Sequence, residues 1–241
     1  AVRERRGTDP SGRSGAVLAP EPAALPASRR EAAAVAGVLP AAELVIGRDA
    51  TEPRLRAALG AGGLVHLATH GELNARNPMF SWLQTASGRD VDPADDGRLE
   101  VHEILGLRVR SPLVFLSGCE TGLGTAWSTA FAPGEDFATL ARAFLYAGAG
   151  SVVATLWRVD DDGAAALAER FYRYLETGPA SALALAQREL LADRRYRAPY
   201  YWAGYTLAGD GGAGWIAKSV GVSVTPGWRP RHNHMPDREN P

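Results

Sequence analysis

The chain has 241 residues, of which 46% are hydrophobic and 22% are charged, and its formal net charge at pH 7 is -1. This balance is typical of a globular protein with one good core, and it gives no electrostatic reason to expect binding to nucleic acid or to an acidic membrane surface. A single cysteine cannot form an internal disulfide bond, which favours a reducing compartment. No stretch has the layout of a signal peptide or the ~20 apolar residues of a membrane-spanning helix. We therefore expect a cytoplasmic protein with no nucleic-acid partner and no membrane partner.

Composition divides the chain into three regions. Residues 1–14 are polar and rich in turn-forming residues, so we expect a linker there. Periodic apolar patterns run over 15–209, where we expect one folded domain. Glycine and proline become denser after this point, and we expect 210–241 to be a partly disordered C-terminal extension. The first residue is Ala1 rather than Met, which we interpret as a fragment of a longer protein or a processed product.

Short apolar runs alternate with helical patterns along the central region. Apolar runs predict strands over 16–19, 44–46, 64–69, 113–117, 151–157 and 201–207. Helical spacing or capping predicts helices over 28–39, 51–59, 100–107, 137–147, 160–176 and 180–194. This alternation is typical of a parallel sheet covered by helices on both faces. The stretch 78–100 does not follow it, and we expect a β-excursion or a loop outside the main sheet.

Two residues with catalytic chemistry follow apolar strands. His70 ends the run from Leu64, and Cys119 ends the run from Pro112, 49 residues further on. Catalytic groups of open parallel sheets lie at the carboxyl ends of the strands, and a histidine about 50 residues before a cysteine is the arrangement of caspases. Imidazole can lower the pKa of the thiol or accept its proton. The alternatives are a small buried Cys119 and a structural hydrogen bond at His70.

Several other histidines have simpler interpretations. His66 lies inside the apolar run, so we expect a buried structural role; on a regular strand it would lie ~13 Å from His70, too far for the two to bind one metal ion. His102, His232 and His234 have no accompanying ligand pattern. We therefore expect neither a metal nor a cofactor.

Ordered motifs from about Gly15 to Gly209 resemble the CHAT family, which is related to caspases, gingipains and separase. The motifs are His66-Leu-Ala-Thr-His-Gly, Leu116-Ser-Gly-Cys-Glu-Thr-Gly, Phe144-Leu-Tyr-Ala-Gly-Ala, Val152-Val-Ala-Thr-Leu-Trp followed by Asp160-Asp161, Phe171-Tyr, Ala186-Gln and Tyr201-Trp-Ala-Gly-Tyr. The resemblance implies an α/β, caspase-like three-layer sandwich with a mainly parallel central sheet. It also implies a dyad for peptide-bond hydrolysis, with Cys119 as the nucleophile and His70 as the acid and base. The backbone N–H groups of Gly71 and Cys119 would form the oxyanion hole.

Substrate preference is indicated only by acidic residues after the strand at 151–157. In separase-like relatives, acids in a comparable stretch help to receive arginine, so the resemblance makes Asp160 and Asp161 candidate substrate-binding residues. The alternative is that they cap the following helix, as Glu135 and Asp136 would at the start of another. Trp157 and Trp202 are large enough to line a pocket, but core packing is the simpler interpretation.

The leading hypothesis is a cysteine endopeptidase that acts on a protein or peptide substrate and is regulated by a partner or sensor module. Many CHAT domains are attached to repeat or sensor domains, and the irregular segments 71–98 and 120–135 are candidates for loops that order on activation. The alternative is a non-catalytic caspase-like interaction scaffold. A nucleotide-binding protein is disfavoured because Gly60 to Gly63 precede a strand rather than a helix. A serine hydrolase is disfavoured because Cys119 occupies the nucleophile position.

Overall fold

A computed structural model of the protein describes residues 15–20, 28–39, 41–74, 76–87, 95–117, 135–157 and 159–211. Cys119, the expected linker at 1–14 and nearly all of the expected C-terminal extension lie outside these ranges. So does most of segment 120–135, of which only Glu135 is described, as the first residue of a helix.

The centre of the domain is a six-stranded sheet with the strand order β2-β1-β3-β7-β8-β9. Its strands are β1 (Gly15–Ala19), β2 (Ala42–Ile46), β3 (Leu64–Ala68), β7 (Leu113–Ser117), β8 (Ser151–Thr155) and β9 (Tyr205–Gly209). Five strands run parallel, and β9 pairs antiparallel with β8 at one edge. Side chains of β1, β3, β7 and β8 are buried on both faces, as a sheet covered on both sides requires.

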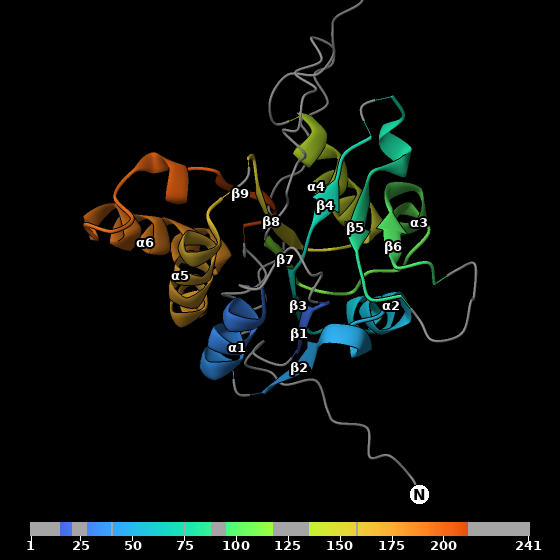
Figure 1. Ribbon diagram of the computed structural model, residues 1–241, viewed down its shortest axis with the longest axis horizontal. Helices are drawn as coiled ribbons and strands as arrows, with labels where there is room; N and C mark the ends of the chain where they lie inside the picture. Colours follow the sequence, from blue (N-terminus) through green and yellow to red (C-terminus); the bar gives the residue numbers. More distant parts are fainter. Residues whose placement is uncertain are drawn as a thin grey trace, which may run out of the picture.

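Two helical layers cover the sheet (Figure 1). On one face lie α1 (Ser28–Val38), α5 (Asp161–Arg173) and α6 (Pro179–Ala192). On the other face lie α2 (Glu52–Ala61), α3 (Val101–Leu105) and α4 (Glu135–Ala147). Alternate strand residues enter two separate cores: Val65 and Leu67 pack in the layer of α2 to α4, whereas Leu64 and Ala68 pack in the layer of α1, α5 and α6. The predicted three-layer sandwich with a mainly parallel sheet is confirmed.

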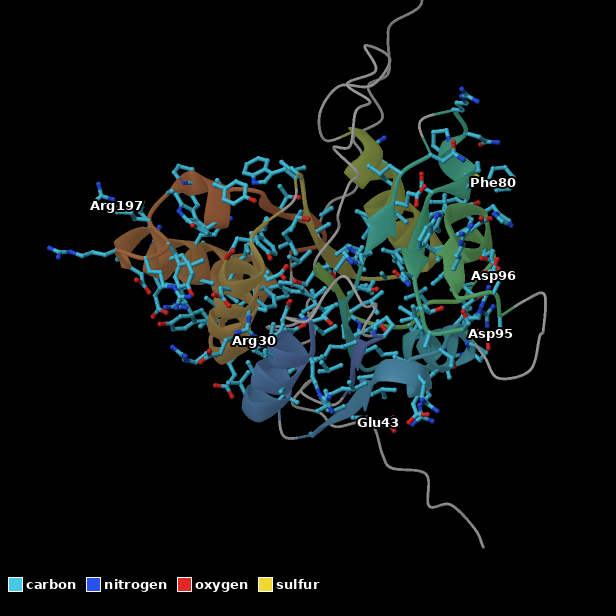
Figure 2. All side chains as sticks on the ribbon, in the orientation of Figure 1. Arg30, Glu43, Phe80, Asp95, Asp96 and Arg197 are labelled. Atoms are coloured by element: carbon cyan, nitrogen blue, oxygen red, sulfur yellow. The ribbon has the colours of Figure 1, made fainter. Side chains whose placement is uncertain are left out.

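A second, three-stranded antiparallel sheet stands beside the first one. It contains β4 (Gly71–Glu72), β5 (Trp82–Gln84) and β6 (Arg98–Glu100), in the order β4-β5-β6. A 3-10 turn at Pro78–Phe80 joins β4 to β5 and forms a tip on which Phe80 is exposed (Figure 2). The β-excursion considered for 78–100 is therefore correct, and segment 71–98 contains regular structure rather than only loops.

The last predicted strand begins later than the sequence pattern suggested. Pro199–Tyr201 form a 3-10 turn, and the N–H of Ala203 donates to the carbonyl of Pro199 at 2.8 Å, so the chain turns before it enters β9. At Gly204 a Cβ atom would lie 2.8 Å from the Trp157 ring, which explains the small residue between turn and strand. Trp157 itself lies beyond the end of β8.

The end of α5 also differs from the expected one. Helix α5 stops at Arg173 and is followed by a 3-10 turn, Leu175–Thr177, inside the range predicted as one helix. Helix α4 ends where expected, because Gly148 adopts the left-handed region with φ of +116°. Within the described ranges, no helix is both long and apolar enough to cross a membrane.

Candidate functional site

The candidate site lies at the carboxyl edge of the central sheet, where β3 and β7 end side by side. Ala68 of β3 is paired in register with Ser117 of β7, and the N–H of Thr69 donates to the carbonyl of Ser117 at 3.0 Å. His70 follows Ala68 by two residues, and Cys119 follows Ser117 by two residues. Cys119 itself is outside the described residues, so the structure describes its neighbourhood only through the strand that leads to it.

His70 occupies the junction between the two sheets. It is buried, and both of its ring nitrogen atoms are shielded from solvent. Its carbonyl accepts the N–H of Gln84 at 2.8 Å, which ties its backbone to the end of β5. His70 therefore lies in the short segment that connects β3 of the main sheet to β4 of the small sheet.

Gly71 opens β4 and is also buried. It pairs with Leu83 of β5, next to the hydrogen-bonded pair of His70 and Gln84. Opposed residues in an antiparallel ladder alternate between hydrogen-bonded and non-hydrogen-bonded pairs. The register therefore directs the N–H of Gly71 away from β5, so that this donor is not used by the small sheet.

The acidic candidates lie at the N-terminus of α5, after the carboxyl end of β8. Asp160 caps the helix, because its Oδ1 accepts the N–H groups of Asp162 and Gly163, both at 3.1 Å. Asp161 is partly exposed in the first turn of the helix. The capping interpretation is thus confirmed for Asp160, whose carboxylate also complements the helix dipole.

Asp162 binds two arginines that come from other parts of the fold. Its carboxylate accepts Arg30 of α1 at 2.9 Å and Arg195, after α6, at 2.7 Å. Figure 2 shows Arg30 on α1, the helix that packs beside α5. All three side chains are exposed, so these ion pairs contribute little stability. They do offset part of the acidic charge at this end of α5.

The two tryptophans considered as pocket residues pack against the core instead. Trp157 and Trp202 are partly buried and contact the core beneath α1, α5 and α6. The indole N–H of Trp157 donates to the carbonyl of Tyr200 at 3.1 Å, and the indole N–H of Trp202 donates to the carbonyl of Arg197 at 3.4 Å. Core packing with a satisfied N–H is therefore the observed role of both. Glu135 and Asp136 are the first two residues of α4.

Comparison with known proteins decides the family. The family model of the CHAT domain matches residues 9–210. The chain belongs to the CHAT domain family. Tetratricopeptide repeat protein 28 of mouse is 29% identical to this CHAT domain over 217 residues, and its human counterpart is 28% identical. Each match covers 77% of this chain but only 9% of the mouse protein and 8% of the human one.

A solved structure shares the fold of this CHAT domain. It is that of the Arg-specific cysteine proteinase gingipain R, with a TM-score of 0.55, 12% sequence identity, and coverage of 84% of this chain and 48% of the proteinase chain. At this identity the likeness concerns the fold alone.

A buried polar cluster surrounds His66 of β3, between the central sheet and the helices α1 and α5. His66 is 0% exposed; its Nδ1 lies 3.1 Å from the hydroxyl of Tyr172, and its Nε2 lies 3.2 Å from the Oε1 of Glu31. The contact with Glu31 lacks hydrogen-bond geometry and is an electrostatic one. Burial raises the pKa of Tyr172 well above its usual range, and the charge of Glu31 adds to this effect. The contacts of His66 with Tyr172 and Glu31 indicate a structural role, as expected from the sequence.

A second buried acid was not singled out from the sequence. Glu52, at the start of α2, is 1% exposed, and its Oε1 accepts the guanidinium of Arg56. Arg56 also donates to Glu103 of α3 at 2.7 Å. Burial raises the pKa of Glu52 to about 7, although hydrogen bonding to Arg56 opposes the rise. The only sequence signal was the i, i+4 spacing of Glu52 and Arg56, which is common on exposed helices.

Proposed function

We propose that this CHAT domain is a cysteine endopeptidase in which Cys119 is the nucleophile and His70 is the general acid and base. The observation that carries the proposal is the register of β3 and β7, since Ala68 and Ser117 are paired and each stands two residues before one of the two reactive side chains. The shared fold with a cysteine proteinase supports it. Burial of the His70 ring nitrogens favours a site from which water is largely excluded.

The chemistry would proceed in two halves. The Cys119 thiolate attacks the carbonyl carbon of the scissile peptide, and the oxyanion that forms accepts hydrogen bonds from the N–H groups of Gly71 and Cys119. Protonated His70 then gives its proton to the leaving amine, which departs and leaves a thioester. Neutral His70 next takes a proton from water, the resulting hydroxide attacks the thioester, and the carboxylic acid product leaves as the Cys119 thiolate is regenerated.

The direction of the Gly71 N–H supports its proposed role as a donor in this oxyanion hole. A donor bonded to β5 would not be available to a substrate, and the strand register points this one away from β5. Loss of one oxyanion-hole donor typically costs about 100- to 1000-fold in rate. Because the strand already holds this amide in place, the N–H needs little reorganisation during the reaction.

We further propose that the enzyme prefers a basic residue before the cut and that Asp161 contributes to this preference. Asp161 is partly exposed in the first turn of α5, after the carboxyl end of β8, and the Oδ1 of Asp160 accepts the N–H groups that it caps. Gingipain R, which shares the fold, is described as Arg-specific, and this supports a preference for a basic residue before the cut. Asp160 would then contribute through its charge rather than through contact.

Regulation by a repeat module fits the curated relatives, which are named as tetratricopeptide repeat proteins and are far longer than this chain. We propose that such a module, or a partner bound by it, controls access to the site. The same observation favours the second candidate function, a caspase-like scaffold that binds a partner without cleaving it. The scaffold would keep its binding when Cys119 is replaced by Ala.

A covalent probe tests the proposal directly. Peptidyl chloromethyl ketones that end in arginine or in alanine are incubated with the domain, and the intact mass is measured over time. Because the chain has a single cysteine, a thiol adduct reports Cys119 alone. We expect one adduct that forms faster with arginine, disappears in Cys119→Ala and slows by about 100-fold or more in His70→Ala. Equal labelling of wild type and His70→Ala would contradict the dyad.

A further inference from the structure

Thr69 is buried, 1% exposed, at the point where β3 leaves the main sheet. Its N–H donates to the carbonyl of Ser117 at 3.0 Å, and its Oγ1 donates to the carbonyl of Gln84 at 2.8 Å. The first bond reaches the end of β7, and the second reaches the end of β5. Thr69 therefore connects the end of β3 to the ends of β7 and β5 by hydrogen bonds at the candidate site.

The bond to Gln84 closes a small ring of hydrogen bonds around His70. Gln84 accepts from the Thr69 hydroxyl with its carbonyl and donates to the carbonyl of His70 with its N–H at 2.8 Å. The dipeptide 69–70 is thus held at two points by one residue of the small sheet. Without the hydroxyl, the part-buried carbonyl of Gln84 would lose a hydrogen-bond partner.

We propose that Thr69 is a positioning residue whose hydroxyl sets the backbone of His70 and Gly71 against the end of β7. The inference rests on the proposed function for its effect on catalysis. Thr69 does not touch the reacting atoms; it acts by fixing the strand exit that carries both the acid–base group and an oxyanion donor. A shift of about 1 Å in such groups can cost about 100-fold in rate.

The chain offers a matched control for Thr69 in a second buried threonine. Thr85 directly follows β5, is 3% exposed, and its Oγ1 has no hydrogen-bond partner among the described residues. Valine replaces the hydroxyl of threonine by a methyl group with almost no change of shape. Thr69→Val and Thr85→Val therefore make the same chemical change at neighbouring buried positions, and only Thr69→Val removes a hydrogen bond.

The first measurement is hydrolysis of a peptide substrate by wild type, Thr69→Val, Thr69→Ser and Thr85→Val. We expect Thr69→Val to lower kcat by about 10- to 100-fold with KM within about twofold, because binding groups are untouched while the reacting groups shift. Thr69→Ser keeps the hydroxyl and should recover most of the rate. Thr85→Val should remain within about twofold of wild type. A Thr69→Val variant as active as Thr85→Val overturns the inference.

The second measurement does not depend on proteolysis and separates the inference from the proposed function. Amide hydrogen exchange of Gln84 is followed by NMR in the same four proteins. We expect protection of the Gln84 N–H to fall at least 10-fold in Thr69→Val and to persist in Thr69→Ser and Thr85→Val. If wild type is inactive but this pattern holds, the proposed function fails and the positioning role stands. Unchanged protection in Thr69→Val overturns the positioning role whatever the activity.

Discussion

The Nδ1 atom of His66 lies 3.1 Å from the hydroxyl oxygen of Tyr172, and both side chains are buried between β3 and α5. Because the pKa of Tyr172 is raised, its hydroxyl keeps its proton and can donate it to Nδ1. The Nε2 atom of His66 faces the carboxylate of Glu31 on α1. The cluster joins two helices to the strand that ends near His70.

The hydroxyl of Tyr172 should therefore contribute measurably to stability. Tyr172→Phe leaves the ring but removes the partner of a buried imidazole nitrogen, and we expect a loss of about 1–3 kcal/mol in the free energy of unfolding. Tyr146→Phe is the control, since Tyr146 is 80% exposed. Urea unfolding of the two variants tests the cluster, and equal midpoints would show that the bond contributes nothing.

Stability should fall as the pH rises from about 4.5 to about 7, owing to Glu52. Its pKa is raised from 4.5 to about 7 in the folded protein, so the folded state binds the proton more tightly than the unfolded chain does. The resulting stabilisation is complete below the unfolded pKa and is lost as the pH rises through the folded one. Glu52→Gln mimics the protonated acid, and we expect it to flatten this part of the pH profile.

The groups acting on Glu52 are Arg56 on its own helix, Glu103 on α3 and Asp96 before β6. Asp95 and Asp96 are labelled in Figure 2. Glu43→Gln is the matched control, because Glu43 also pairs with an arginine, Arg54, but is exposed. Chemical unfolding at several pH values should show a flattened profile only for Glu52→Gln. If Glu43→Gln and Glu52→Gln change the profile equally, burial of Glu52 is not the cause.

Asp160 and Asp161 should respond differently to alanine. Asp160→Ala removes the N-cap of α5 and should lower stability by about 1 kcal/mol, with the choice of cleaved residue largely kept. Asp161→Ala should reduce cleavage after arginine relative to cleavage after alanine, with a smaller effect on stability. Thermal unfolding and competitive peptide cleavage separate the two effects. Unchanged preference in Asp161→Ala would remove the support for a basic specificity.

Two glycines should respond to alanine with opposite signs. Gly148 has φ of +116°, and a Cβ atom there would lie 2.5 Å from the carbonyl oxygen of Val109, so Gly148→Ala should destabilise by about 2 kcal/mol or more. Gly37 is exposed in α1, and a Cβ atom there would meet nothing within 4 Å. Gly37→Ala should stabilise by about 0.5 kcal/mol. Denaturant midpoints that move in the same direction for both variants would contradict this account.

Local patterns in the sequence predicted the layers of the fold well, for identifiable reasons. The strand over 113–117 was predicted with the bounds that β7 has, because a short apolar run between Pro112 and Gly118 leaves little freedom. His70 was predicted at a strand end because its polar neighbours break the apolar run. The late start of β9 was missed because aromatic residues such as those at 201–202 favour strands, whereas here they lie in a turn.

Contacts between distant elements could not be predicted in the same way. His66 and Tyr172 are 106 residues apart, and Arg56 and Glu103 are 47 apart. Ser28 and Glu31 have the spacing of a helix cap, whereas the carboxylate of Glu31 faces His66 across the core. Periodicity tells which face of an element is buried, but the partner on that face depends on how the layers are stacked.

The central claim is that Cys119 cleaves peptide bonds with the help of His70. The most direct test is cleavage of a diverse peptide mixture by wild type, Cys119→Ala and His70→Ala, with the products identified by mass spectrometry. We predict cuts, enriched after arginine, that are absent in Cys119→Ala and reduced by about 100-fold or more in His70→Ala. Cuts that persist in Cys119→Ala, or a wild-type protein that cuts nothing, would contradict the claim.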